Sequence, residues 1–265
     1  VYSKNEELKM YNENLSSNIN LVNELVKRDL KKKYRGSILG VAWTILNPLL
    51  MMVVLTLVFS NIFRFDIKNF PLYLITGQVI FSFFSEATNL AMVSIIGNAS
   101  LIKKIYVRKS LFPISSVTFS LVNTLFSIIA IFLIVLITNS KISISFLLIP
   151  VILLYVYIFS FGIGLVLSTL AVYFRDIIHL YGVFLMILMY LTPIFYPENI
   201  IPEKYKALIA LNPMIYFVSY FRKILYTGEI PSLSLNLICL SISMTSLIVG
   251  SFIFKKFQNM FVLKI

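Results

Sequence analysis

The sequence predicts an all-α integral membrane protein with six transmembrane helices, an N-terminal amphipathic interface helix and a re-entrant external hairpin between spans five and six. Three observations support this fold class. Hydrophobic residues make up 59% of the 265 residues, against roughly 45–50% in soluble domains. Charged residues make up only 13%, which is too few to cover a surface exposed to water. Long apolar runs follow one another along most of the chain.

This composition excludes several other classes of protein. A disordered chain and a soluble enzyme both need a larger polar and charged share. A disulfide-stapled scaffold is excluded because Cys239 is the only cysteine. The net charge of +12 would suggest nucleic acid in a soluble protein. Here most basic residues flank apolar runs, so we expect membrane lipid as a partner, and no nucleic acid.

Six segments are long and apolar enough to cross a bilayer, which takes about 20 residues of helix. All six are predicted to be helices, because strands with unpaired edges are not viable in hydrocarbon. The predicted spans are residues 36–63, 72–96, 110–140, 142–174, 177–197 and 230–254. We assign residues 1–35 to a cytoplasmic N-terminus and residues 36–265 to the six-helix membrane domain.

The distribution of basic residues predicts which side of the membrane each loop faces. With six spans both termini lie on one side, and the segments on that side hold 16 of the 23 Lys and Arg residues. Six of these crowd between Lys27 and Arg35, directly before the first span. The positive-inside rule therefore places both termini in the cytoplasm.

An amphipathic helix is predicted over residues 19–34, before the first span. Apolar residues recur there at spacings of three and four. They are Ile19, Val22, Val26 and Leu30, with Leu21 and Leu25 widening the stripe. Such a helix would lie at the inner membrane surface with its lysines among the headgroups. A solvated charged helix is the alternative.

The cytoplasmic loop 97–113 interleaves basic residues with apolar ones. Its apolar residues form a short helical face, which needs lipid or another protein as a partner. A plain positive-inside loop explains the composition equally well.

The external stretch 196–229 is longer than a connector requires. Its apolar run of 15 residues, 207–221, is too short to cross the bilayer but long enough to dip into it. We predict a re-entrant or interfacial hairpin broken at Pro202 and Pro213. An ordinary aromatic belt at the outer interface is the alternative.

Glu86 is the only charged residue within a predicted span. Because a carboxylate in the membrane needs a partner, we expect a polar contact at a helix or subunit interface, or a position that faces a cavity. Proton coupling is a further possibility, but no basic residue within a span is available to pair with Glu86.

Small residues and prolines also mark the spans. Gly36 and Gly40 have small-xxx-small spacing, and Gly162 and Gly164 fall within span four; both pairs would allow close helix approach. Pro193 in span five, like Pro48 in span one, predicts a bend.

No constellation of catalytic residues is visible. His179 is the only histidine, which excludes metal sites built on several His or Cys ligands. The nine glycines form no G-x-x-x-x-G-K-[ST] loop for phosphate. The chain is therefore expected to be no enzyme and to bind no cofactor, and another subunit must power any nucleotide-driven work.

Four motifs in order resemble ABC-2 type permeases that export polysaccharides such as O-antigen, capsule and teichoic acid. The motifs are Lys27–Ser37 followed by Leu39-Gly40, Trp43 and Asn47-Pro48-Leu49; Tyr173-Phe174-Arg175-Asp176-Ile177; Thr192-Pro193-Ile194-Phe195-Tyr196; and Leu211-Asn212-Pro213-Met214. The similarity covers nearly the whole chain from about Leu21.

The resemblance implies a half-transporter of a bacterial cytoplasmic membrane. Two copies would pair as a homodimer, and two copies of a separate ATP-binding cassette subunit would bind ATP and Mg. The implied entrance for a polyprenyl-diphosphate-linked glycan is Lys31, Lys32, Lys33 and Arg35. The implied docking loop for the ATPase is Leu101, Ile102, Lys103, Lys104, Ile105, Tyr106 and Arg108. The external hairpin would form re-entrant helices near the exit.

We therefore expect ATP-driven export of a lipid-linked surface polysaccharide. Aromatic side chains suit such a path because sugar rings present apolar C–H faces to π surfaces, and Tyr190, Phe195 and Tyr196 are the residues that we expect to line it. The alternatives are a small-molecule or drug exporter of the same superfamily and an integral-membrane enzyme that acts on lipid-linked sugars.

Overall fold

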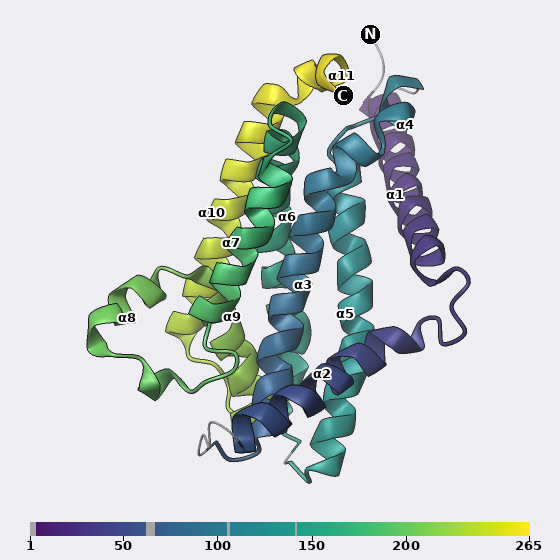
Figure 1. Ribbon diagram of the computed structural model, residues 1–265. Coiled ribbons are helices and arrows are strands. Elements are labelled where there is room, and N and C mark those ends of the chain that lie inside the picture. The colour runs from purple at the N-terminus through teal and green to yellow at the C-terminus, as the bar shows by residue number, and fades with distance from the viewer. Residues whose placement is uncertain (1–3, 62–66, 105–106, 141) are drawn as a thin grey trace.

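The computed structural model describes residues 4–61, 67–104, 107–140 and 142–265, and these residues form helices and connecting turns without a strand (Figure 1). The α-helices are α1 (Lys4–Tyr34), α2 (Ala42–Asn61), α3 (Phe70–Gly97), α4 (Ala99–Lys104), α5 (Leu111–Ile137), α6 (Ile149–Tyr173), α7 (Ile177–Leu191), α8 (Glu203–Ala210), α9 (Pro213–Arg222), α10 (Leu233–Phe257) and α11 (Phe261–Lys264). Short 3₁₀ turns at Ile144–Leu148, Glu198–Ile200 and Gln258–Met260 and a π turn at Lys223–Thr227 complete the described elements. The prediction of an all-α membrane protein is confirmed.

Five helical segments of the described chain are long and apolar enough to cross a membrane, rather than the six expected. They comprise α2, α3, α5, α6 with the turn before it, and α10 with α11. The segment predicted at 177–197 is helical only as far as Leu191, and α7 has 15 residues, about 22 Å of helix. The helix stops there because Thr192 is extended and Pro193 offers no N–H to continue the ladder.

Helix α6 is the centre of the bundle and packs between α3 and α10. Its two glycines confirm the expected close approach: a methyl group added at Gly164 would lie 2.7 Å from Cβ of Ala91 in α3, and one added at Gly162 would lie 2.4 Å from the backbone of Ser246 in α10. The hydroxyls of Ser243 and Ser246 bond carbonyls of α6 at 2.8 and 2.9 Å across the same contact. Small and hydroxylated residues therefore set this interface, as in other membrane helix pairs.

The prediction that Gly36 and Gly40 pack helices together is wrong. Their φ angles are 78° and 49°, and a Cβ at either position meets no atom closer than 4.0 Å. Both lie in the turn between α1 and α2, where the left-handed backbone needs a residue without Cβ. These glycines end α1 and redirect the chain.

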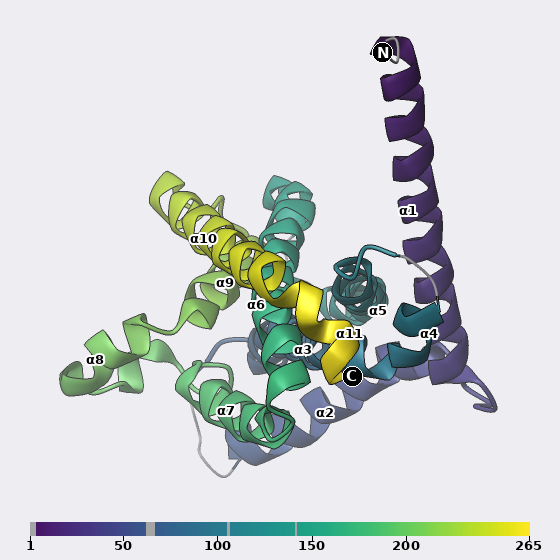
Figure 2. The same cartoon turned by 90° about the horizontal axis from the view of Figure 1, so that it is seen from above.

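Helix α2 crosses α3 and α5 obliquely along the lower part of the bundle in Figure 1 and is one of the outermost elements when the molecule is seen from above (Figure 2). Met52 is buried, whereas Trp43, Leu50 and Val54 are exposed. Within a single chain, α2 therefore keeps one face against the bundle and leaves a large apolar surface uncovered.

The last turn of α1 packs against α5, whereas the rest of the helix runs out from the bundle when the molecule is seen from above (Figure 2). The middle of its predicted apolar stripe faces the protein. Leu25 and Val26 are buried, whereas Ile19 is 53% exposed. Leu25 belongs to a cluster with Ile102 of α4 and Phe261 of α11. The stripe thus anchors α1 on the end of the bundle where both termini lie (Figure 1).

The opposite end of the bundle carries the long stretch after α7. The chain begins α8 just after Pro202 and α9 at Pro213, so the two predicted breaks are confirmed. The side chain of Asn212 caps α9 by accepting a hydrogen bond from the N–H of Met214 at 2.9 Å, which is the usual role of asparagine at this position. Phe217 and Phe221 of α9 are fully buried, so α9 is part of the core, while α8 stands away from it (Figure 1).

Candidate functional site

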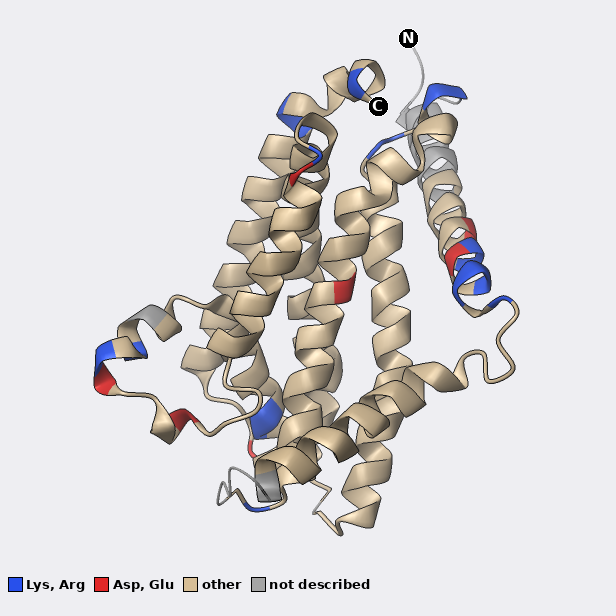
Figure 3. Cartoon of the chain, viewed as in Figure 1, with Lys and Arg blue, Asp and Glu red and all other residues tan. Residues whose placement is uncertain are grey.

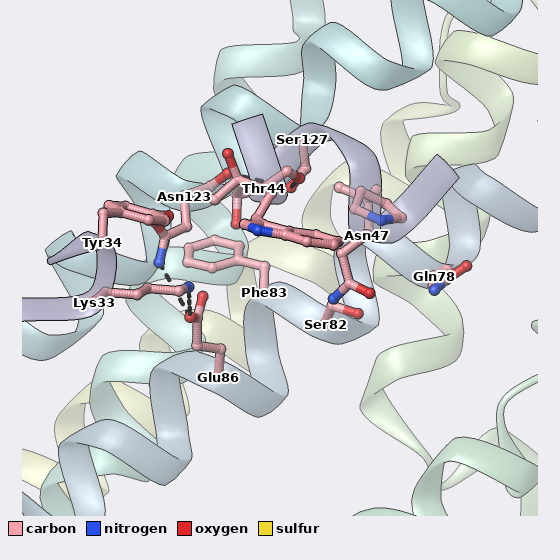
Figure 4. A pocket seen from close by; sticks show the side chains of 14 residues that line it. Lys33, Tyr34, Thr44, Asn47, Gln78, Ser82, Phe83, Glu86, Asn123 and Ser127 are labelled. Carbon is pink, nitrogen blue, oxygen red and sulfur yellow. Dashed lines mark hydrogen bonds and ion pairs between the residues drawn. The ribbon is translucent and has the colours of Figure 1, made fainter. Parts of the chain in front are cut away.

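An ion pair between Lys33 and Glu86 stands where two cavities meet. The inner cavity, of about 460 Å³, lies between the end of α1 and the helices α2, α3 and α5 (Figure 4). The basic cavity, of about 670 Å³, lies between α1, α3 and the start of α5. Lys33 and Glu86 line both. Figure 3 shows the basic end of α1 at the level of the single acidic residue of α3, midway along that helix.

The geometry of the pair is that of a hydrogen-bonded network. Nζ of Lys33 lies 2.8 Å from Oε1 of Glu86, and the side-chain amide of Asn123 donates to the same oxygen at 3.1 Å. The hydroxyl of Tyr34 donates to Oδ1 of Asn123 at 3.0 Å, and burial raises the pKa of Tyr34, so this hydroxyl keeps its proton. The network ties α1 to α3 and α5.

Lys33 is the partner of Glu86 that sequence reasoning missed. Span counting assigned Lys33 to the segment before the membrane domain and Glu86 to the middle of span two. The two meet because the end of α1 reaches the middle of α3 and packs against α5 before the turn at Gly36 redirects the chain. The sequence did contain one indication of this contact, because a carboxylate within a membrane span needs a cation as its partner.

The polar lining of the inner cavity comes from α1, α2, α3 and α5, and one face of α3 contributes three of its residues. Gln78, Ser82 and Glu86 follow one another at four-residue spacing, which places them on the same side of a helix. Asn47 and Trp43 of α2 face them across the cavity, as Figure 4 shows for Asn47. A cavity with hydroxyl, amide and carboxylate groups can bind a polar ligand beside apolar helices.

The basic cavity gathers cations from the last turns of α1. Arg28, Lys32 and Lys33 line it together with Asp29. Nη1 of Arg28 also donates to Oδ1 of Asn98, just after α3, at 2.9 Å. Arg28 pairs with Asp29 at 2.8 Å and Lys33 pairs with Glu86 at 2.8 Å. Three cations against these two carboxylates leave an excess of one positive charge, on Lys32, which suits an anionic group.

The four basic residues expected at an entrance are therefore divided. Lys32 and Lys33 line the basic cavity, whereas Lys31 and Arg35 are exposed and line neither cavity.

The residues expected to dock an ATPase lie at the end of the bundle that carries both termini. Leu101 is half-buried and Ile102 is buried, so both point into the cluster with α1 and α11 rather than outward. Lys103, Lys104 and Arg108 are exposed. Ile105 and Tyr106 lie outside the described residues. The outward surface of this loop is thus basic among the residues that the structure describes.

The three aromatic residues expected to line a path gather at the end of α7, where Tyr190 lies in its last turn and Phe195 and Tyr196 follow it. The hydroxyl of Tyr196 donates to the carbonyl of Tyr190 at 2.7 Å, and the rings of Tyr190 and Phe195 lie 6.4 Å apart. Tyr190 is 61% exposed, whereas Phe195 is 9% exposed. Within one chain, Tyr190 presents its ring to the outside and Phe195 packs into the core.

Charge reversal tests the ion pair. Glu86→Lys places two ammonium groups side by side and is expected to lower the midpoint temperature of thermal unfolding in nanodiscs. The double variant Lys33→Glu/Glu86→Lys restores opposite charges, so its midpoint temperature should return most of the way to that of the wild type. A double-mutant cycle should give a coupling of about 1 kcal/mol, because the pair is only partly exposed. The matched control is Lys27 with Glu24, whose side chains are 70% and 69% exposed and should show almost no coupling. Equal coupling in both pairs would contradict a special role for Glu86.

The chain was also compared with known proteins. Residues 20–226 match the ABC-2 type transporter family. The chain is 31% identical to the O-antigen export system permease protein RfbA of Klebsiella pneumoniae, over 94% of this chain and 96% of that protein. It is 29% identical to RfbA of Myxococcus xanthus, over 91% and 94% of the two chains. It is 25% identical to the polysialic acid transport protein KpsM of Escherichia coli, over 86% and 90%. The family match covers well over half of the sequence, and the chain therefore belongs to the ABC-2 type transporter family.

Proposed function

We propose that this chain is the transmembrane subunit of an ATP-driven exporter that moves a lipid-linked surface polysaccharide across the bacterial cytoplasmic membrane. The observation that carries the proposal is the pair of cavities at Lys33 and Glu86: one suits an anionic headgroup and the other a polar chain. Relatives that match over most of their length are O-antigen and capsule export proteins, which supports a glycan as the cargo. A lipid diphosphate attached to a glycan carries both chemistries in one molecule.

The proposed topology has six crossings with both termini in the cytoplasm. The crossing added to the five long helical segments is α7 together with the non-helical residues 192–197. Non-helical backbone is tolerated at membrane depth when protein buries it, and Thr192, Pro193, Ile194 and Phe195 are all buried. The excess of basic residues beside α1, α4 and α10 supports a cytoplasmic location for that end.

Two finer features belong to the same proposal. The exposed lysines of α1 would meet the headgroups of the inner leaflet, so that α1 acts as an interface helix. The helices α8 and α9 would form the re-entrant external hairpin near the exit, since α9 is apolar and has only 10 residues, too few to cross.

The proposed assembly is a homodimer with two copies of an ATP-binding cassette subunit, which would bind ATP and Mg. A second copy would cover part of the exposed apolar surface of α2 and α7, and Tyr190, Phe195 and Tyr196 would lie along the path between the copies. The exposed Lys103, Lys104 and Arg108 would contact the ATPase.

Deletion of the gene in the bacterium that carries it tests this function. We expect the deletion strain to lose its surface glycan and to accumulate the lipid-linked glycan inside the cell, and a plasmid copy to restore export. The tagged permease should also co-purify with an ATPase subunit. A complete surface glycan in the deletion strain would overturn the proposal, and increased drug sensitivity with normal glycan would point to a small-molecule exporter.

A further inference from the structure

We propose that the inner cavity binds the first sugar ring of the lipid-linked glycan, the one attached to the diphosphate, while the diphosphate occupies the basic cavity. The proposal rests on the proposed function and adds to it a sugar-reading site formed by α2 and α3. Three observations carry it: unused hydrogen-bonding groups, an exposed aromatic face, and the charge arrangement at the boundary between the cavities.

The inner cavity contains polar side chains that have no partner of their own. Within the described part of the chain, the side chains of Asn47, Gln78 and Ser82 make no hydrogen bond, and Oε1 of Gln78 is buried without a partner. The carboxylate of Glu86 accepts its bonds from Lys33 and Asn123 through Oε1, so Oε2 stays available. The side chains of Asn47 and Ser82 are exposed, so only the buried oxygen of Gln78 carries the cost of a missing partner. That oxygen indicates a bound polar ligand, and the free groups of Asn47, Ser82 and Glu86 are placed to bind the same ligand.

The donors and acceptors match the chemistry of a sugar. Each hydroxyl of a pyranose can both donate and accept a hydrogen bond. Amide and hydroxyl side chains can do the same, and a carboxylate can accept from a sugar hydroxyl. Gln78, Ser82 and Glu86 lie at successive turns of α3, so they present acceptors over about 12 Å of the helix. This length covers the hydroxyls along one edge of a ring and its first neighbour.

An aromatic face completes the cavity. Trp43 is the only tryptophan of the chain, and it is 46% exposed although it lies on a membrane helix and lines the cavity. An indole offers an apolar π surface to the C–H face of a sugar and one N–H donor at its rim. Phe83 of α3, 1% exposed, forms a second aromatic part of the wall.

The ion pair between Lys33 and Glu86 favours the phosphate on one side and the sugar on the other. Phosphate oxygens are attracted to Arg28, Lys32 and Lys33 and repelled by the carboxylate of Glu86. The carboxylate of Asp29 also lines the basic cavity, but it is paired with Arg28 at 2.8 Å. Sugar hydroxyls, by contrast, can donate to that carboxylate. Because Lys33 and Glu86 line both cavities, a phosphate held on the lysine side brings the attached ring directly to the glutamate side.

Equilibrium binding to the intact permease–ATPase complex in nanodiscs, without nucleotide, tests the assignment. The probes are radiolabelled polyprenyl diphosphate and the same lipid bearing N-acetylglucosamine or galactose. We expect the wild type to bind at least one sugar-bearing lipid more tightly than the bare diphosphate. The double variant Asn47→Leu/Ser82→Ala should lose most of this extra affinity for the sugar-bearing lipid. We expect its affinity for that lipid to fall about tenfold, because two hydrogen bonds are lost, and its affinity for the bare diphosphate lipid to stay unchanged.

Asn89→Leu is the matched control, because Asn89 lies on α3 outside both cavities and bonds the carbonyl of Ser85. It should bind all probes as the wild type does. If the wild type binds bare and sugar-bearing lipids equally, or if the cavity variant weakens both equally, the sugar site is overturned while the exporter function stands. If the wild type binds none of these lipids, both proposals fail.

Discussion

Replacing Gly250 with alanine is expected to destabilise the protein more than any other single methyl group added to a glycine of the bundle. A Cβ at Gly250 would lie 2.1 Å from the carbonyl oxygen of Gly162, and the nearest other atoms are also backbone atoms of Gly162. Backbone cannot rotate away as a side chain can, so α6 and α10 must move apart. Overpacking of this kind costs about 3 kcal/mol.

The separation would also break the polar contacts that hold the two helices. Ser243 and Ser246 donate to the carbonyls of Tyr155 and Phe159 at 2.8 and 2.9 Å, and both bonds depend on the short distance between the helices. In a membrane, packing and such hydrogen bonds replace the hydrophobic effect as the force between helices. We therefore expect the loss of packing and the loss of hydrogen bonds to add up.

The measurement is thermal unfolding of the purified protein in nanodiscs, with Gly97→Ala as the control. At Gly97 an added Cβ meets no atom within 4 Å, so this variant should unfold at or slightly above the wild-type temperature, since alanine favours helix by about 1 kcal/mol. A Gly250→Ala protein as stable as the Gly97→Ala protein would show that the helices do not approach as closely as described.

Hydropathy predicted most of the bundle because each membrane helix must satisfy its own backbone. The predicted segments 72–96 and 110–140 correspond to α3 and α5 within a few residues at each end. The ends that were misplaced share a cause. Residues 36–41 and 192–197 contain no charged side chain, so a count of uncharged runs extends the span through them. It does not reveal that glycine with positive φ precedes α2 and that proline ends α7.

The candidate site was only partly predictable, because its members come from distant parts of the chain. The carboxylate of Glu86 and the cluster of basic residues were each visible in the sequence. Their meeting depends on where the end of α1 reaches α3 and α5, which no local pattern encodes. Gln78 and Ser82 are four residues apart and therefore lie on one face of the helix. The average hydropathy of the span does not reveal this polar face.

Arg222 is the clearest case of a residue whose role the sequence concealed. It was counted among the basic residues of an external loop, yet it is 6% exposed, and burial lowers its pKa to about 10. Its guanidinium donates to the carbonyls of Pro193 at 2.6 Å, Ile194 at 3.0 Å and Tyr73 at 3.3 Å. It also stacks on the ring of Tyr73, 3.5 Å from the centroid.

These bonds explain how the chain tolerates non-helical backbone after α7. Once the helix ends at Leu191, the carbonyls of Pro193 and Ile194 have no helical donor, and both residues are buried. Buried carbonyls without donors are costly, and the planar fork of an arginine can serve several at once. Arg222 therefore joins the end of α7, the start of α3 and α9.

Arg222→Met is expected to destabilise the end of the bundle that carries α8 and α9 by about 4 kcal/mol, because three buried carbonyls lose charged donors. Arg222→Lys should recover only part of this loss, since an ammonium cannot reach all three carbonyls or stack on Tyr73. The test is limited cleavage by trypsin at Lys204 and Lys206 of α8 in the purified protein in nanodiscs. Cleavage should be fastest in the methionine variant and intermediate in the lysine variant.

Arg175→Met is the matched control for the loss of an arginine, because Arg175 is exposed and its side chain makes no hydrogen bond or ion pair within the described residues. Its cleavage rate and unfolding temperature should equal those of the wild type. If Arg222→Met were cleaved no faster than this control, the carbonyls after α7 must find other donors. The segment of α8 and α9 would then be held by the apolar packing of α9 alone, and the buried charge of Arg222 would have no structural role.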